Sequence, residues 1–108
     1  MNRGDIVTIA VQGDFGKPRP ALVVQSDTFS ETHATITLLL ISSEIIHAPL
    51  FRLTLEPSIN NGLSKKSQIQ IDKIMTVRRE KIGHIIGRVD DKSMLQVKRA
   101  LMVWLGLA

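Results

Sequence analysis

Short apolar segments separated by turn-forming residues run through the first 89 positions of the chain and predict β-strands. Residues 6–11 interleave isoleucine and valine with smaller side chains, and residues 21–25 are short and apolar. Residues 35–41 are apolar on both faces after Thr37, which predicts a central strand. Two glycines and two prolines make residues 12–20 a predicted loop. Further strands are predicted over residues 50–55, 67–71, 74–77 and 84–89.

The last part of the chain changes to a helical period. Apolar side chains recur at spacings of three and four residues, which predicts one helix over residues 91–105. Asp90 is a suitable N-cap, and Gly106 lies where a C-terminal cap is expected. The apolar stripe consists of Met94, Val97, Leu101, Trp104 and Ala108.

This order of elements predicts a mainly β fold with a C-terminal helix, built as a small, strongly bent antiparallel sheet or barrel. The length of 108 residues and a hydrophobic fraction of 44% suit one globular domain over residues 1–108. The chain has no cysteine, which excludes disulfides, thiolate nucleophiles and cysteine-based metal sites. The three histidines lack a zinc-type spacing, so we expect no bound metal.

The chain also lacks the sequence features of export or membrane insertion. Its N-terminus has no signal-peptide pattern, and its uninterrupted apolar runs, such as residues 38–41, are far shorter than the ~20 residues needed to span a bilayer. We therefore expect a cytoplasmic protein that does not enter a membrane.

Positive charge is concentrated in one region of the chain. The net charge is +4, but residues 60–88 alone carry seven basic and two acidic side chains. This segment is a candidate surface for a polyanion, and a solvated basic face without a ligand is an equally good interpretation.

Three polar positions could carry phosphate chemistry. Arg19 lies between Pro18 and Pro20, so its guanidinium could be held rigidly against a phosphate, or it could form a salt bridge that anchors the loop. The hydroxyls of Ser42 and Ser43 could contact phosphate or 2′-OH groups, or they could satisfy backbone groups of the following loop.

Asp72 could act as a general base or pair with the adjacent Lys73. Gln70 lies on the same predicted strand face as Asp72, opposite the apolar face. In the predicted loop, Phe15 could stack on a nucleotide base or anchor the loop to the core.

Five segments of the chain form a recognisable set: residues 3–7 (RGDIV), 16–24 (GKPRPALVV), 41–43 (ISS), 67–77 and the start of the helix at 89–95. Together, and in this order, they resemble the MazF/PemK family of type II toxin–antitoxin endoribonucleases. The resemblance implies an SH3-like barrel that forms a homodimer. It also implies metal-independent and cofactor-independent cleavage of single-stranded RNA, in which the 2′-OH attacks the adjacent phosphate. The implied partner is a cognate antitoxin with an acidic, partly disordered tail.

The resemblance also assigns roles to individual residues. Arg19 matches the catalytic arginine, Ser42 a position that is usually threonine, and Asp72 the acid of PemK-type members. Gln70 stands where those members carry arginine, and Gly13-Asp14 stand where they carry a His-Glu pair. We therefore predict that Arg19 stabilises the pentacoordinate phosphate, that Ser42 positions it, and that Asp72 or Asp14 takes the 2′-OH proton. The residues predicted to bind RNA are Asp14, Phe15, Lys17, Ser43, Gln70, Lys73 and Arg78.

Two other functions fit the same fold. CcdB-type toxins have a similar fold but bind DNA gyrase, and their chains end in a Trp-Gly-Ile tail that residues 104–108 (WLGLA) match only loosely. The Arg19-Pro20 pair is typical of the nuclease branch and favours RNA cleavage. An inactive binding module is the third alternative, because a barrel fold does not fix a function.

Overall fold

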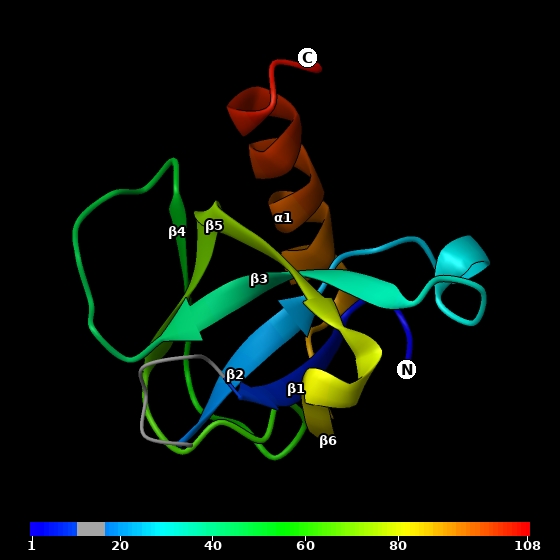
Figure 1. Ribbon diagram of the computed structural model, residues 1–108. Helices are drawn as coiled ribbons and strands as arrows, with labels where there is room; N and C mark the ends of the chain where they lie inside the picture. The colour runs from blue at the N-terminus through cyan, green and yellow to red at the C-terminus, as the bar shows by residue number, and fades with distance from the viewer. Residues whose placement is uncertain (11–16) are drawn as a thin grey trace.

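The computed structural model describes residues 1–10 and 17–108 (Figure 1). Six antiparallel strands form one sheet in the order β4-β5-β3-β2-β1-β6, and a single α-helix follows them. β4 and β6 lie at the two ends of this order, so the sheet is bent but not closed by strand pairing between them. The strands are β1 (Asp5–Ala10), β2 (Pro18–Val23), β3 (Thr35–Ser42), β4 (Arg52–Leu55), β5 (Ser67–Arg78) and β6 (Ile82–Arg88), and the helix is α1 (Asp91–Trp104). Two short 3₁₀ turns, Asp27–Phe29 and Arg79–Lys81, lie in the connections.

The predicted fold class is confirmed, with β3 inside the sheet as its pattern indicated. Two predictions about individual strands are wrong. β2 begins at Pro18, so Arg19 lies within a strand and not in the predicted loop. The separate strands predicted over residues 67–71 and 74–77 are one continuous strand, β5. Residues 11–16 lie outside the described residues, and they include Asp14 and Phe15, which the sequence predicts as site residues in a loop.

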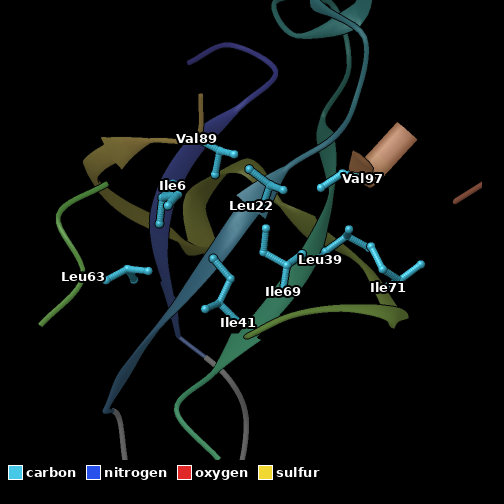
Figure 2. Close-up of a cluster of buried hydrophobic side chains, with 9 residues drawn as sticks. All are labelled: Ile6, Leu22, Leu39, Ile41, Leu63, Ile69, Ile71, Val89 and Val97. Atoms are coloured by element: carbon cyan, nitrogen blue, oxygen red, sulfur yellow. The ribbon is translucent and has the colours of Figure 1, made fainter. Parts of the chain in front are cut away.

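Two hydrophobic clusters cover the two faces of the sheet. Leu22 and Leu39 belong to the first cluster, which Val97 of α1 completes (Figure 2). Ala21 and Leu38, their neighbours in sequence, belong to the second cluster. Because successive side chains of a strand point to opposite faces, β2 and β3 contribute to both clusters.

β5 passes from one cluster to the other. Ile69 and Ile71 pack in the first cluster, whereas Met75 packs against the second. The change of face follows from the pairing with β3: Leu39 lies opposite Ile74, and Ile41 lies opposite Ile69. Between these two pairs, β5 covers five residues while β3 covers two. The three extra residues of β5 are an odd number, so its alternate side chains change to the opposite face of the sheet.

The helix begins as its sequence predicts. Asp90 is the N-cap, and one of its carboxylate oxygens accepts a hydrogen bond from the Ser93 backbone N–H at 2.9 Å. Hydrogen bonds from Ser93, first from its side chain and then from its backbone, lower the pKa of Asp90. At the other end, Gly106 adopts a φ of 71°, which is the left-handed conformation expected after a helix.

Candidate phosphate-binding groove

A groove of about 220 Å³ lies across one end of the sheet. It is formed by the start of β2, the end of β3 and the segment that leads into β5. Lys17, Arg19 and Lys65 bring three basic residues to it, and Ser43 and Ser64 bring hydroxyl groups. The other lining residues are Pro18, Pro20, Ile41, Leu63 and Ser67. Cations beside hydroxyl donors suit a phosphate group.

The pairing of β2 with β3 ends before it reaches Arg19 and Ser42. Ala21 lies opposite Leu40 of β3, and towards the start of β2 Arg19 lies opposite Ile9 of β1. Arg19 lines the groove, as do Ile41 and Ser43 on either side of Ser42. Ser42 itself is not among the lining residues, so the structure brings the predicted catalytic arginine together with Ser43.

The Ser42 hydroxyl is oriented by the loop that follows it. Its oxygen accepts a hydrogen bond from the Glu44 backbone N–H at 3.1 Å. This is the backbone role considered for this residue from the sequence. The hydroxyl hydrogen takes no part in that bond, so Ser42 retains a donor that a phosphate oxygen could accept.

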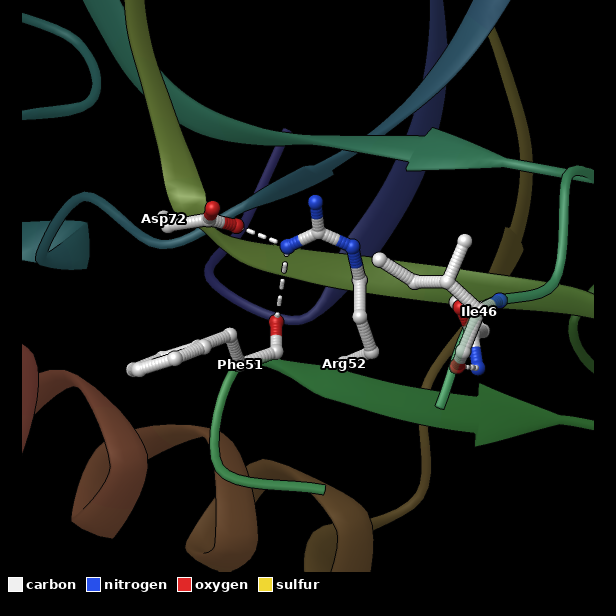
Figure 3. A network of polar contacts seen from close by, with 5 residues as sticks. Ile46, Phe51, Arg52 and Asp72 are labelled. Atoms are coloured by element: carbon white, nitrogen blue, oxygen red, sulfur yellow. Dashed lines mark hydrogen bonds and ion pairs between the residues drawn. The ribbon is translucent and has the colours of Figure 1, made fainter. Parts of the chain in front are cut away.

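Asp72 is held by a residue that the sequence analysis did not select. Arg52 of β4 donates through Nη1 to a carboxylate oxygen of Asp72 and to the Phe51 carbonyl oxygen (Figure 3). The ion pair is largely shielded, since the Arg52 and Asp72 side chains are 11% and 21% exposed. The proposed pairing of Asp72 with Lys73 is therefore wrong, because the partner is Arg52.

Asp72 does not line the groove. Gln68 lies opposite Ser42, and Asp72 lies four residues further along β5, which corresponds to about 13 Å of extended strand. Gln70, half-buried, lies between them and opposite Arg52.

The remaining predicted RNA-binding residues are spread over the sheet. Lys17 and Ser43 line the groove with Arg19. Lys73 and Arg78 are exposed on β5, and Arg78 pairs with Thr35 at the opposite end of β3 from Ser42. The structure therefore gathers Lys17, Arg19 and Ser43, and it leaves Lys73 and Arg78 away from the groove.

Three residues around this site were not predicted from the sequence. Lys65 had a signal, because it belongs to the basic segment, and it lines the groove beside Ser64. Arg52 and Gln68 had no comparable signal, because their importance depends on which strands pair with β5.

In the described ranges 1–10 and 17–108, no three histidine, aspartate or glutamate side chains lie close enough together to hold a metal ion. None of the helical segments in these ranges has the length and apolar character that crossing a bilayer requires.

Comparison with known proteins identifies the family. The family model described as "PemK-like, MazF-like toxin of type II toxin-antitoxin system" matches residues 2–105. A protein of Mycolicibacterium smegmatis named "Probable endoribonuclease MazF" is 43% identical, with 100% of this chain and 99% of the relative covered. Endoribonuclease EndoA of Bacillus subtilis is 27% identical, with 99% of this chain and 96% of the relative covered.

Solved structures agree on the fold. A mycobacterial endoribonuclease in complex with its cognate antitoxin superposes with a TM-score of 0.84 at 21% identity, covering 100% of this chain and 97% of that chain. A MazE-MazF structure from Deinococcus radiodurans gives a TM-score of 0.81 at 17% identity, covering 100% and 98%. With the family match over nearly its whole length, the chain belongs to the PemK-like, MazF-like toxins of type II toxin–antitoxin systems.

Proposed function

We propose that this protein is a sequence-specific endoribonuclease toxin that cleaves single-stranded RNA without a metal ion and without the ribosome. The observation that carries the proposal is the groove in which Lys17, Arg19 and Lys65 meet the hydroxyl-bearing Ser43. Membership of the toxin family and the endoribonuclease names of its relatives support the same activity. Nothing in the family match favours the gyrase-binding alternative.

In the proposed reaction the ribose 2′-oxygen attacks the adjacent phosphorus. A bond forms between phosphorus and the 2′-oxygen, and the bond to the 5′-oxygen breaks, which leaves a 2′,3′-cyclic phosphate and a 5′-hydroxyl. Arg19 stabilises the charge that develops on the pentacoordinate phosphate. Ser42, whose oxygen accepts from the Glu44 N–H, donates its hydroxyl hydrogen to a phosphate oxygen and positions the group.

A general base must accept the 2′-OH proton, and a general acid must protonate the leaving 5′-oxygen. Asp14 and Asp72 are the two candidates for the base. Asp72 has one oxygen engaged by Arg52 and lies outside the groove, about 13 Å of strand from the position opposite Ser42, so it can accept the proton only if the bound RNA extends along β5 to reach it. Replacing each aspartate by asparagine assigns the base, since only the true base loses catalysis with little change in RNA affinity.

The proposal includes the partners. The solved relatives include toxins bound to an antitoxin, and residues 60–88 of this chain, with seven basic and two acidic side chains, suit an acidic antitoxin tail. We place the protein in the cytoplasm as a homodimer, in accordance with the resemblance to MazF/PemK toxins.

The test is cleavage of a long single-stranded RNA by antitoxin-free protein in EDTA, with the fragment ends mapped. Wild type is expected to give discrete fragments with cyclic-phosphate ends. Arg19→Ala is expected to abolish them, whereas Arg99→Ala, on the exposed surface of α1, is expected to cleave as wild type does. Intact RNA with the wild-type protein across varied sequences would contradict the proposal, and a gyrase supercoiling assay would then test the alternative.

A further inference from the structure

Gln68 is a buried glutamine whose side chain is fully engaged, and it follows Ser67 of the groove lining. It is 3% exposed and lies on β5 directly opposite Ser42. Its Nε2 donates to the Ile46 carbonyl oxygen at 3.0 Å and to Thr54 Oγ1 at 3.2 Å. Its Oε1 accepts from the Ile46 backbone N–H at 3.1 Å. The two bonds to Ile46 hold the loop that follows Ser42 and Ser43.

These two bonds give the loop the hydrogen-bonding pattern of an added strand. Both backbone groups of Ile46 point toward Gln68, as the two groups of one residue do when a strand pairs with its neighbour. In an extended chain the groups of the preceding and following residues point the other way. The same alternation would direct the backbone N–H and C=O of Ile45 and His47 outward.

Those outward groups have no protein partner in the part of the chain that the structure describes. Ile45 and Ile46 are also 45% and 43% exposed. The stretch begins two residues after Ser43, which lines the groove. It therefore combines unpaired backbone donors and acceptors with apolar side chains immediately beside the proposed phosphate site.

We propose that residues 45–47, held by Gln68, are a base-recognition edge for single-stranded RNA. Unstacked bases present hydrogen-bonding edges that backbone N–H and C=O groups can read, and apolar side chains pack on base faces. Gln68 is a positioning residue in this arrangement, because it touches the loop and not the RNA. The inference rests on the proposed function and adds to it the element that selects the bases next to the cleaved phosphate.

The primary test compares Gln68→Met with wild type in binding and cleavage of an RNA oligonucleotide. Methionine keeps the length of the side chain but cannot form the two bonds to Ile46. Loss of the edge is expected to raise KM about tenfold, since one or two hydrogen bonds contribute on the order of 1.4 kcal/mol in total. The kcat at the preferred site should change much less, and cleavage should spread to other sequences.

Two control variants separate recognition from stability. Gln25 clamps a loop in the same way at the far end of β3, where its amide accepts from the Thr37 N–H at 3.0 Å and donates to the Phe29 carbonyl at 3.3 Å. Gln25→Met should lower the unfolding temperature but leave KM and the cleavage pattern unchanged. Thr54→Val removes the third bond of Gln68 while keeping both bonds to Ile46, so it should also preserve KM.

RNA binding is measured separately with an oligonucleotide that lacks the 2′-hydroxyl at the cleavage site. Hydrogen exchange at the Ile46 backbone amide reports whether its hydrogen bond to Gln68 is formed. The inference is overturned if Gln68→Met leaves KM, affinity and cleavage pattern unchanged, or if Gln25→Met alters them equally. It is also overturned if the Ile46 amide is unprotected in wild type. If wild type binds the oligonucleotide in a Gln68-dependent way but cleaves no RNA, the catalytic proposal fails while the recognition edge stands. If only an acidic peptide competes for this edge and RNA does not bind there, the occupant is a protein strand and the inference fails.

Discussion

Gly87 lies where β6 passes closest to the turn formed by residues 58–62. A Cβ added at Gly87 would run into the carbonyl group of Asn61 and would lie 2.7 Å from the carbonyl oxygen of Asn60. The same turn is joined to β6 by a hydrogen bond of 2.8 Å from the Arg88 N–H to the Asn60 carbonyl. Gly87→Ala therefore forces two backbone segments apart.

The turn cannot easily move to accept the methyl group, because Asn61 holds it internally. The Asn61 side chain accepts from the N–H groups of Ser58 and Leu63 at 3.0 Å each and donates to the Glu56 carbonyl at 2.8 Å. Overpacking of this kind costs about 1–3 kcal/mol, and the lost bond to Asn60 costs about 1 kcal/mol more. Alanine also restricts the unfolded chain more than glycine does, which stabilises the folded state by about 0.4–1 kcal/mol. We therefore expect the free energy of unfolding to fall by about 2–3 kcal/mol in total.

In urea denaturation this loss of stability should appear as a lower midpoint concentration of urea with an unchanged m-value. A functional effect should accompany it, because the turn leads directly into Leu63, Ser64 and Lys65 of the groove wall. We expect Gly87→Ala to weaken RNA binding even under conditions in which the variant is fully folded.

Gly106→Ala is the matched control. Gly106 has a φ of 71° and no atom within 4 Å of an added Cβ, so the substitution costs stability through conformation alone. It should leave RNA binding unchanged. A loss of less than about 0.5 kcal/mol for Gly87→Ala, within the range of ordinary surface substitutions, would refute the close approach of β6 to the turn.

Other parts of the structure give three further expectations. Ile69→Ala, fully buried in the first cluster, should lower the free energy of unfolding by about 2–5 kcal/mol in urea titrations, and a loss below about 1 kcal/mol would contradict its core position. Phe51 and Trp104 meet edge to face with ring centroids 5.1 Å apart, so a double-mutant cycle of their alanine variants should give a coupling of about 0.5–1.5 kcal/mol, whereas additive losses would show no contact. The pKa of Asp90 is lowered in the folded protein, so its cap stabilises the protein above the unfolded pKa, and this stabilisation is lost as the pH falls through the folded pKa. The difference in unfolding free energy between wild type and Asp90→Ala should therefore shrink in acid. A difference that stays constant with pH would contradict this role of Asp90.

Local patterns in the sequence were sufficient for the elements and the fold class. The period of the apolar residues predicted α1 to within one residue of its end, and Asp90 and Gly106 marked its boundaries. The residues after Thr37, apolar on both faces, identified β3 as an inner strand. These features depend on neighbours along the chain, which is why a single sequence reveals them.

The errors arise where distant segments decide the structure. Prolines on both sides of Arg19 suggested a loop, but pairing with β1 extends β2 through them. The continuity of β5 depends on its irregular pairing with β3, which no local period encodes. For the candidate site, Arg19 and Lys17 both line the groove, whereas the partner of Asp72 comes from β4, twenty residues away in sequence, and could not be predicted from local pattern.

The pairing of β1 with β6 joins the beginning of the chain to one of its last strands. During synthesis, β2 and β3 can form their hairpin, with Arg19 near the start of β2, long before Arg88 has left the ribosome. The facing wall of the groove is different, because its turn is fastened to β6 through Arg88 and Asn60. The groove is therefore completed only when nearly the entire chain has emerged, so an unfinished nascent chain carries the arginine but not the finished site. For a protein that attacks RNA, this order of assembly delays activity until after its own message has been read almost to the end.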